Sequence, residues 1–155
     1  IVFNYSLEQI AVVLALAAAP ITELRGAIPI AITQYHMPVP MAYGLSVLGN
    51  LIPVVVLLLL LEQATILASR IPIAKRVMDW VFAHTRRRHS QKVERWGKAA
   101  LVVIVSIPLP MTGAWTGSIV AFLFGISFRE AFPLIGLGVL IAGVIVTLLT
   151  LPFGP

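Results

Sequence analysis

The sequence lacks cysteine altogether and has few charged residues. No cysteine occurs among its 155 residues, which excludes a disulfide framework, thiol catalysis and a zinc–thiolate site. Only 11% of the residues are charged, whereas a soluble domain carries about 25%. Hydrophobic residues make up 59% of the chain, and its mean hydropathy is +1.01. This composition predicts an all-α integral membrane protein, with residues 1–155 forming a single membrane domain.

Motifs of soluble enzymes are also missing. The chain has neither a GxxxxGK[ST] phosphate-binding loop nor a GxSxG nucleophile motif, and its carboxylates are scattered. We therefore expect no enzyme activity, no cofactor and no metal site.

Most of the positive charge lies in residues 70–98. This segment holds nine of the eleven Lys and Arg residues, and only Asp79 and Glu94 oppose them. A basic segment between apolar blocks marks the cytoplasmic side of a membrane. We therefore predict a multi-pass protein of the prokaryotic cytoplasmic (inner) membrane with segment 70–98 inside, and no nucleic-acid partner.

The first part of this segment has the pattern of an interfacial amphipathic helix. In "IPIAKRVMDWVFAH" charged residues occupy one helical face, and the other face carries Ile73, Val77, Trp80, Val81 and His84. Such a helix lies on the membrane surface. One alternative function follows: a non-transporting membrane scaffold whose basic residues, Arg86 to Arg88 among them, recruit partners or anionic lipid.

Two uncharged runs have the length of one membrane crossing. A helix crosses the hydrocarbon core with about 20 residues. The uncharged runs 40–61 and 131–155 meet this requirement. We predict full transmembrane helices at about 40–62 and 130–152.

Two further apolar regions fit re-entrant hairpins. Residues 99–128 are uncharged but contain "SIPLPMTG", in which Pro108 and Pro110 disfavour a continuous helix. The opening region has two short apolar arms around "PITELRG". We predict hairpins at about 7–36 and 99–127; a single helix over 9–35, bent at Pro20, is the alternative for the first.

The two hairpins predict an inverted repeat. "PITELRGAIPIAI" aligns with "PMTGAWTGSIVAF", matching Pro20 with Pro110, Thr22 with Thr112 and Ala31 with Ala121. Each hairpin is followed by one span, and the two units have opposite orientations. Opposed repeats of this kind are typical of secondary transporters.

The hairpin tips carry the candidate site residues. Charge at membrane depth is costly and marks a functional site by default. We predict that Glu23 takes up and releases a proton and that Arg25 binds an anion through its planar guanidinium. A structural pair, Glu23 neutralising Arg25, is the alternative.

The second tip supplies polar and aromatic candidates. Thr112, Trp115 and Thr116 are predicted to face the substrate, and Arg129 to contact it or to anchor to phosphates by snorkelling. For Ser118 we expect a hydrogen bond to its own helix, and for Asn50 a hydrogen bond between packed helices.

"PITELRGAIPIAI" and "PLPMTGAWTGSIVAFLFG" resemble the signature segments of the prokaryotic small multidrug export family. This family is similar in layout to DedA-like membrane proteins, which carry two opposed re-entrant hairpins. The resemblance implies a transporter, a homo-oligomer such as a dimer, and membrane lipids as partners. Some DedA-like members are implicated in proton-coupled movement of lipid phosphates. DedA-like proteins typically carry an arginine in or just after the second hairpin and acids around the first. Arg129 and Glu23 match this pattern loosely, but the second tip itself is uncharged.

These observations predict a proton-coupled secondary transporter for an amphipathic or lipid-like substrate, with an anionic lipid or a lipid phosphate as candidates. Efflux of cationic amphiphilic drugs, bound by Glu23 and the Trp115 ring, is a second alternative.

Overall fold

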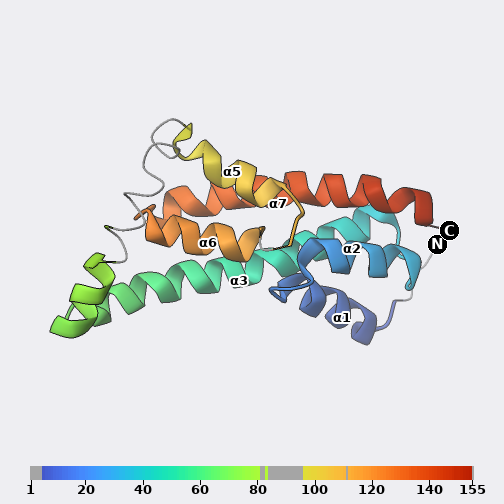
Figure 1. The fold of residues 1–155 in the computed structure, drawn as a ribbon. Helices are drawn as coiled ribbons and strands as arrows, with labels where there is room; N and C mark the ends of the chain where they lie inside the picture. Colours follow the sequence, from blue (N-terminus) through green and yellow to red (C-terminus); the bar gives the residue numbers. More distant parts are fainter. Residues whose placement is uncertain (1–4, 81–82, 84–95, 111, 155) are drawn as a thin grey trace.

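A computed structural model describes residues 5–80, 83, 96–110 and 112–154 (Figure 1). Within these ranges the chain is helical and contains no strand, as the composition predicts. The predictions made for Val81, His84 and Arg86 to Arg88 lie outside the described residues.

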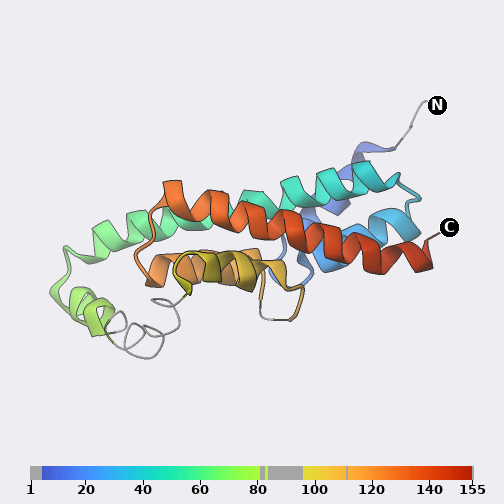
Figure 2. The ribbon, with the colours of Figure 1, turned by 90° about the horizontal axis from the view of Figure 1, so that it is seen from above.

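Two long helices extend along the molecule. Helix α3 comprises Val39–Ala68, and α7 comprises Phe128–Thr150, followed by the short 3₁₀ helix η1, Leu151–Phe153. Figures 1 and 2 show that α3 and α7 run side by side in opposite directions, and they pack against each other. By length and composition, Val39–Ala68 and Phe128–Phe153 are each able to cross a membrane.

Helix α3 is longer than the sequence indicates. The predicted span ends at residue 62, whereas the helix continues through Glu62 to Ala68. Its 30 residues correspond to about 45 Å, which exceeds the roughly 30 Å of a hydrocarbon core. Glu62 is exposed, so the last turns project beyond the part of α3 that packs in the interior.

The first helix pair consists of α1, Leu7–Ala18, and α2, Glu23–Thr33. A capping box begins α1: Gln9 N–H donates to the Ser6 hydroxyl, and Ser6 N–H donates to the Gln9 side chain. The chain reverses direction between Ala18 and Glu23, and α1 and α2 pack against each other. The alternative of one continuous helix bent at Pro20 is therefore wrong.

The second helix pair consists of α5, Ala99–Ser106, and α6, Ala114–Leu123. The Thr112 side chain stabilises the intervening turn, since its hydroxyl lies 2.6 Å from the Ile107 carbonyl oxygen and 2.7 Å from that of Leu109 and donates its one proton to either. It also accepts a hydrogen bond from Leu109 N–H at 3.1 Å. Pro108 and Pro110 disfavour a continuous helix here, because each lacks the amide proton and each biases the residue before it away from helical geometry.

The two helix pairs approach each other from opposite ends of the molecule. In Figures 1 and 2 the pair α1–α2 lies beside one half of the long helices, and α5–α6 lies beside the other half. The turns of both pairs lie near the middle of the molecule. Residues from distant parts of the sequence meet there.

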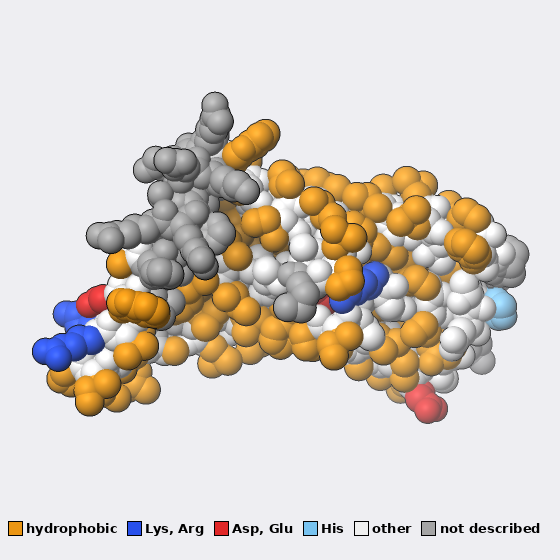
Figure 3. All heavy atoms as spheres, in the orientation of Figure 1, with side chains coloured by type: hydrophobic (Ala, Val, Ile, Leu, Met, Phe, Trp, Pro, Cys, Tyr) orange, Lys and Arg blue, Asp and Glu red, His pale blue; other side chains and the backbone are white. Residues whose placement is uncertain are grey.

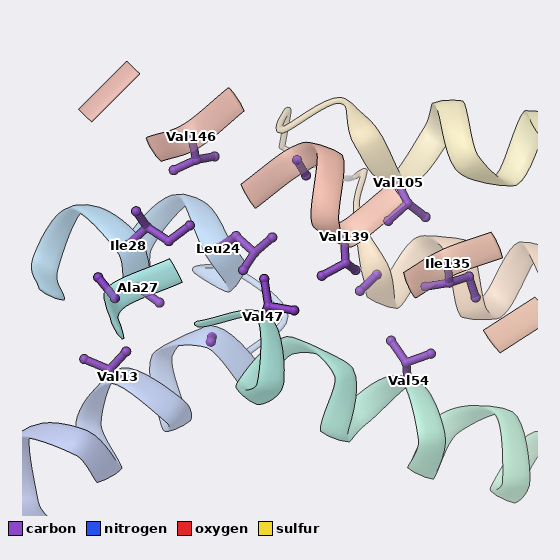
Figure 4. Close-up of a cluster of buried hydrophobic side chains, with 14 of the residues drawn as sticks. Val13, Leu24, Ala27, Ile28, Val47, Val54, Val105, Ile135, Val139 and Val146 are labelled. Carbon is purple, nitrogen blue, oxygen red and sulfur yellow. The ribbon is translucent and has the colours of Figure 1, made fainter. Parts of the chain in front are cut away.

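Each helix pair packs on a long helix through a glycine. A Cβ atom at Gly49 of α3 would lie 2.8 Å from Ala17 Cβ and from the Leu14 carbonyl oxygen of α1. A Cβ at Gly138 of α7 would lie 2.6 Å from Val105 Cβ of α5. Aliphatic side chains from both pairs and both long helices form one core (Figure 4).

The outer surface is largely hydrophobic in the view of Figure 3, with charged side chains at few places. Exposed apolar residues are frequent on the long helices, including Leu60 and Leu148. Residues 72–80 are helical, and Ile73, Val77 and Trp80 are exposed there beside exposed charges.

Candidate functional site

Glu23 is buried where the two helix pairs meet. It is the first residue of α2, and 8% of its surface is exposed. Its backbone has φ 45°, in the left-handed region that non-glycine residues seldom adopt. The backbone of Glu23 is therefore strained at the reversal of the chain after Ala18, and strained backbone conformations concentrate at functional sites.

The Glu23 carboxylate lies at the N-terminus of helix α6. The backbone N–H of Trp115 donates to Glu23 Oε1 at 3.4 Å, and the N–H of Ala114 also contributes a hydrogen bond. These amides belong to the first turn of α6, which has no helical partners for them. A side chain of the first helix pair thus caps a helix of the second.

Gly113 makes this contact possible. Its φ of 110° with ψ of −161° belongs to a region that is open essentially to glycine alone. A Cβ atom at this position would overlap Glu23 Oε2 and lie 2.9 Å from Glu23 Cδ. The residue immediately before α6 therefore has to be glycine for the carboxylate to approach.

Trp115 provides a second link between the turns. Its indole N–H donates to the carbonyl of Ala18, the last residue of α1, at 3.0 Å. Trp115 also donates its backbone N–H to Glu23. It therefore binds a residue before the turn between α1 and α2, Ala18, and a residue after it, Glu23.

Arg25 lies beside Glu23 but does not form an ion pair with it. The guanidinium donates to the Ile21 carbonyl from Nε at 3.1 Å and also from Nη2. Arg25 is half-buried and, like Glu23, lines a small cavity between the helix pairs. A guanidinium has five N–H donors, so this group retains the capacity to bind an anion.

The cavity beside Glu23 has a volume of about 20 Å³, room for one water molecule. Residues of five helices and of the second turn line it, among them Leu24, Asn50, Ala114 and Val139. Asn50 is 1% exposed, and its Oδ1 atom has no hydrogen-bond partner among the described residues. The predicted helix-packing hydrogen bond of Asn50 is therefore wrong for this oxygen.

The other predicted residues occupy different positions. Thr112 holds the second turn, and half-buried Thr116 lies in the first turn of α6. Ser118 donates to the Ala114 carbonyl of its own helix at 2.8 Å, which confirms the prediction for that side chain.

Arg129 is not part of this cluster. It is exposed in the first turn of α7, next to Glu130, which pairs with Lys98. Val139, which does line the cavity, is ten residues further along, or about 15 Å of helix.

Asn50 was a polar candidate for which a helix-packing hydrogen bond was favoured over a place in the site, and Gly113 was not among the predicted site residues. Asn50 has a sequence signal, since an amide within a long apolar run needs a partner. Gly113 has a weaker sequence signal, because the need for glycine at this position follows only from the approach of the Glu23 carboxylate.

Fold and site together define a small helical membrane protein with a buried carboxylate and a nearby guanidinium between two helix pairs. The chain belongs to the family described as "Putative small multi-drug export protein", which matches residues 23–145. The matched region begins at Glu23 and includes the cavity. No curated protein and no solved structure matches the chain. An export family indicates a transporter rather than an enzyme.

Proposed function

We propose that this protein is a proton-coupled secondary transporter for an amphipathic substrate that carries an anionic group, with a lipid phosphate as the leading candidate. In this proposal α1–α2 and α5–α6 are re-entrant hairpins, and the substrate passes where their turns meet. The observation that carries the proposal is the buried Glu23 carboxylate bound across the two turns to Trp115, beside Arg25.

The internal correspondence of the two halves supports alternating access. In the alignment of the two tips, Glu23 corresponds to Gly113, and these two residues contact each other. Both have positive φ, and each lies at the start of the second arm of its pair. A similar glycine contact occurs in each half, between Gly49 and Leu14 and Ala17 and between Gly138 and Val102 and Val105. An inverted repeat places a substrate site at the interface of its units.

The cavity supports assigning this structure to a closed state. A space for one water molecule cannot hold a phosphate group together with the Glu23 carboxylate. Transport would then require the two turns to separate, which breaks the hydrogen bonds of Trp115 to Glu23 and Ala18. In this cycle Arg25 binds the anionic group, Glu23 carries the proton, and Thr112 and Thr116 lie close to the path.

Native mass spectrometry of gently extracted protein tests the proposal. We expect wild-type protein to retain a phosphate-bearing lipid and Arg25→Gln to lose it, because the guanidinium supplies the charged hydrogen bonds. Arg129→Gln is the matched control, since it removes the same charge about 15 Å from the cavity and should retain the lipid. Equal retention in all three proteins would contradict the proposal and favour efflux of cationic amphiphiles.

A further inference from the structure

The N-terminus of α6 has the properties of an anion-binding site. Helix N-termini present unpaired N–H groups and the positive end of the helix dipole, so they bind carboxylate and phosphate groups. Here the anion bound to Ala114 and Trp115 is the carboxylate of Glu23 itself. The site is therefore formed and filled within one chain.

The surroundings of the carboxylate suit an external anion. Arg25 lines the same cavity, and Glu23 and Arg25 are its charged lining residues. Asn50 lines it as well, with an amide that is 1% exposed and an Oδ1 atom without a partner among the described residues. A 180° rotation of this amide exchanges Oδ1 and the NH₂ group, and an NH₂ group directed into the cavity would donate to a bound anion.

We propose that the α6 N-terminus, Arg25 and Asn50 form a binding site for a phosphate monoester, and that the Glu23 carboxylate occupies this site until the substrate displaces it. The cavity holds no more than about one water molecule, so the two anions exclude each other. This inference rests on the proposed function for its substrate class. It goes further in assigning Glu23 as a competitor for the site rather than a contact of the substrate.

The competition predicts a gain of affinity when the charge of Glu23 is removed. The probe is n-hexyl phosphate, titrated into full-length protein in detergent and followed by Trp115 fluorescence after Trp80→Phe and Trp96→Phe substitution. We expect the protein with Glu23→Gln to bind the probe about ten-fold more tightly, or better, than the protein that carries only the two tryptophan substitutions. The neutral glutamine amide binds the α6 N-terminus more weakly than the carboxylate, so the probe displaces it more easily. Glu62→Gln, an equal change at an exposed position of α3, should leave the affinity unchanged.

A second variant tests the site without altering Glu23. We expect Asn50→Ala to weaken hexyl phosphate binding by about ten-fold, since one charged hydrogen bond is lost. Ser46→Ala is the matched control: Ser46 is also buried and unpartnered among the described residues, one turn earlier on α3, but does not line the cavity. Inorganic phosphate is titrated in parallel. Tighter binding of hexyl phosphate assigns the site to a lipid, and equal binding assigns it to a free phosphate.

Unchanged or weaker binding by Glu23→Gln would overturn the inference, as would wild-type binding by Asn50→Ala. A protein that retains a phosphate lipid but gains no affinity in Glu23→Gln refutes the competition and leaves the proposed function intact. A protein that gains affinity but retains no lipid refutes the lipid transport function and leaves the anion site intact.

Discussion

At the residue scale, the site depends on two adjacent backbone conformations that are both unfavourable for ordinary residues. Glu23 has φ 45° and Gly113 has φ 110°, and the carboxylate of the first lies against the backbone of the second. Conformations of this kind cost on the order of 1–3 kcal/mol each and persist where surrounding contacts impose them. The hydrogen bonds of Trp115 to Glu23 and to Ala18 provide such contacts.

Gly113→Ala tests this arrangement. The added methyl group overlaps the Glu23 carboxylate and occupies a backbone region closed to alanine, so we expect a loss of about 1–3 kcal/mol or more in unfolding free energy. Thermal unfolding in detergent measures it. Gly136→Ala is the control, because a Cβ there meets nothing within 4 Å and lies in a helix. If both variants unfold at the same temperature, the close contact is not essential.

At the element scale, each helix pair is held to a long helix by a glycine without which the backbones could not approach. Gly49 packs against Leu14 and Ala17 of α1, and Gly138 packs against Val102 and Val105 of α5. In both cases the contacting residues are three apart on the first arm of a pair. The two glycine contacts are therefore alike: each would bring a Cβ against a carbonyl oxygen and a Cβ atom three residues apart on the first arm of a pair.

Gly49→Ala and Gly138→Ala are expected to destabilise the protein by similar amounts. Each methyl group would enter a space already filled by backbone or Cβ atoms, and overpacking of this kind costs about 1–3 kcal/mol. Gly44→Ala, where no atom lies within 4 Å, serves as the control on α3. Thermal unfolding again gives the comparison. A large effect at only one of the two positions would argue against equivalent packing.

Some features of the elements follow from the sequence, and others do not. The reversal between α1 and α2 and the break between α5 and α6 follow from Pro20, Pro108 and Pro110 together with arms too short to cross a membrane. The extension of α3 to Ala68 does not, because one exposed Glu62 is compatible with a helix that leaves the apolar layer. The lengths of apolar runs therefore do not give the ends of helices.

The candidate site was predictable to a similar extent. A charge within an apolar run identifies Glu23 and Arg25, since membrane depth penalises unneeded charge. The sequence does not show that Arg25 donates to the Ile21 carbonyl, and the separation of Arg129 from both residues depends on how the helices pack. The position of Asn50 in the cavity also depends on helix packing. The sequence places an amide on this helix but does not show that its oxygen lacks a hydrogen-bond partner.

At the scale of the whole molecule, the proposed topology places the two helix pairs on opposite sides of the membrane. The links that follow α3 and α6 lie at one end of the molecule, and the link between α2 and α3 lies at the other (Figures 1 and 2). Exposed Ser69 and Ser127 belong to the first two links, and exposed His36 to the third. The basic segment 70–98 would then lie on the same side as Ser69 and Ser127.

Labelling of single cysteines tests this topology, and the chain has no native cysteine to interfere. We expect Ser69→Cys and Ser127→Cys to react with a membrane-impermeant maleimide only from the cytoplasmic side. His36→Cys should react only from the opposite side. Each variant is also labelled after detergent permeabilisation, which controls for reactivity. Labelling of Ser69→Cys and Ser127→Cys from opposite sides would refute the arrangement of two re-entrant pairs.

The contact between Glu23 and Gly113 has a consequence for the origin of such a chain. If the two halves descend from one duplicated ancestor, these positions began as the same residue. Two glutamates facing each other would repel, and two glycines would leave the helix termini without an acceptor. A homodimer of one unfused product would place the same residue on both sides, so the Glu23–Gly113 contact requires two halves whose sequences have diverged at this position.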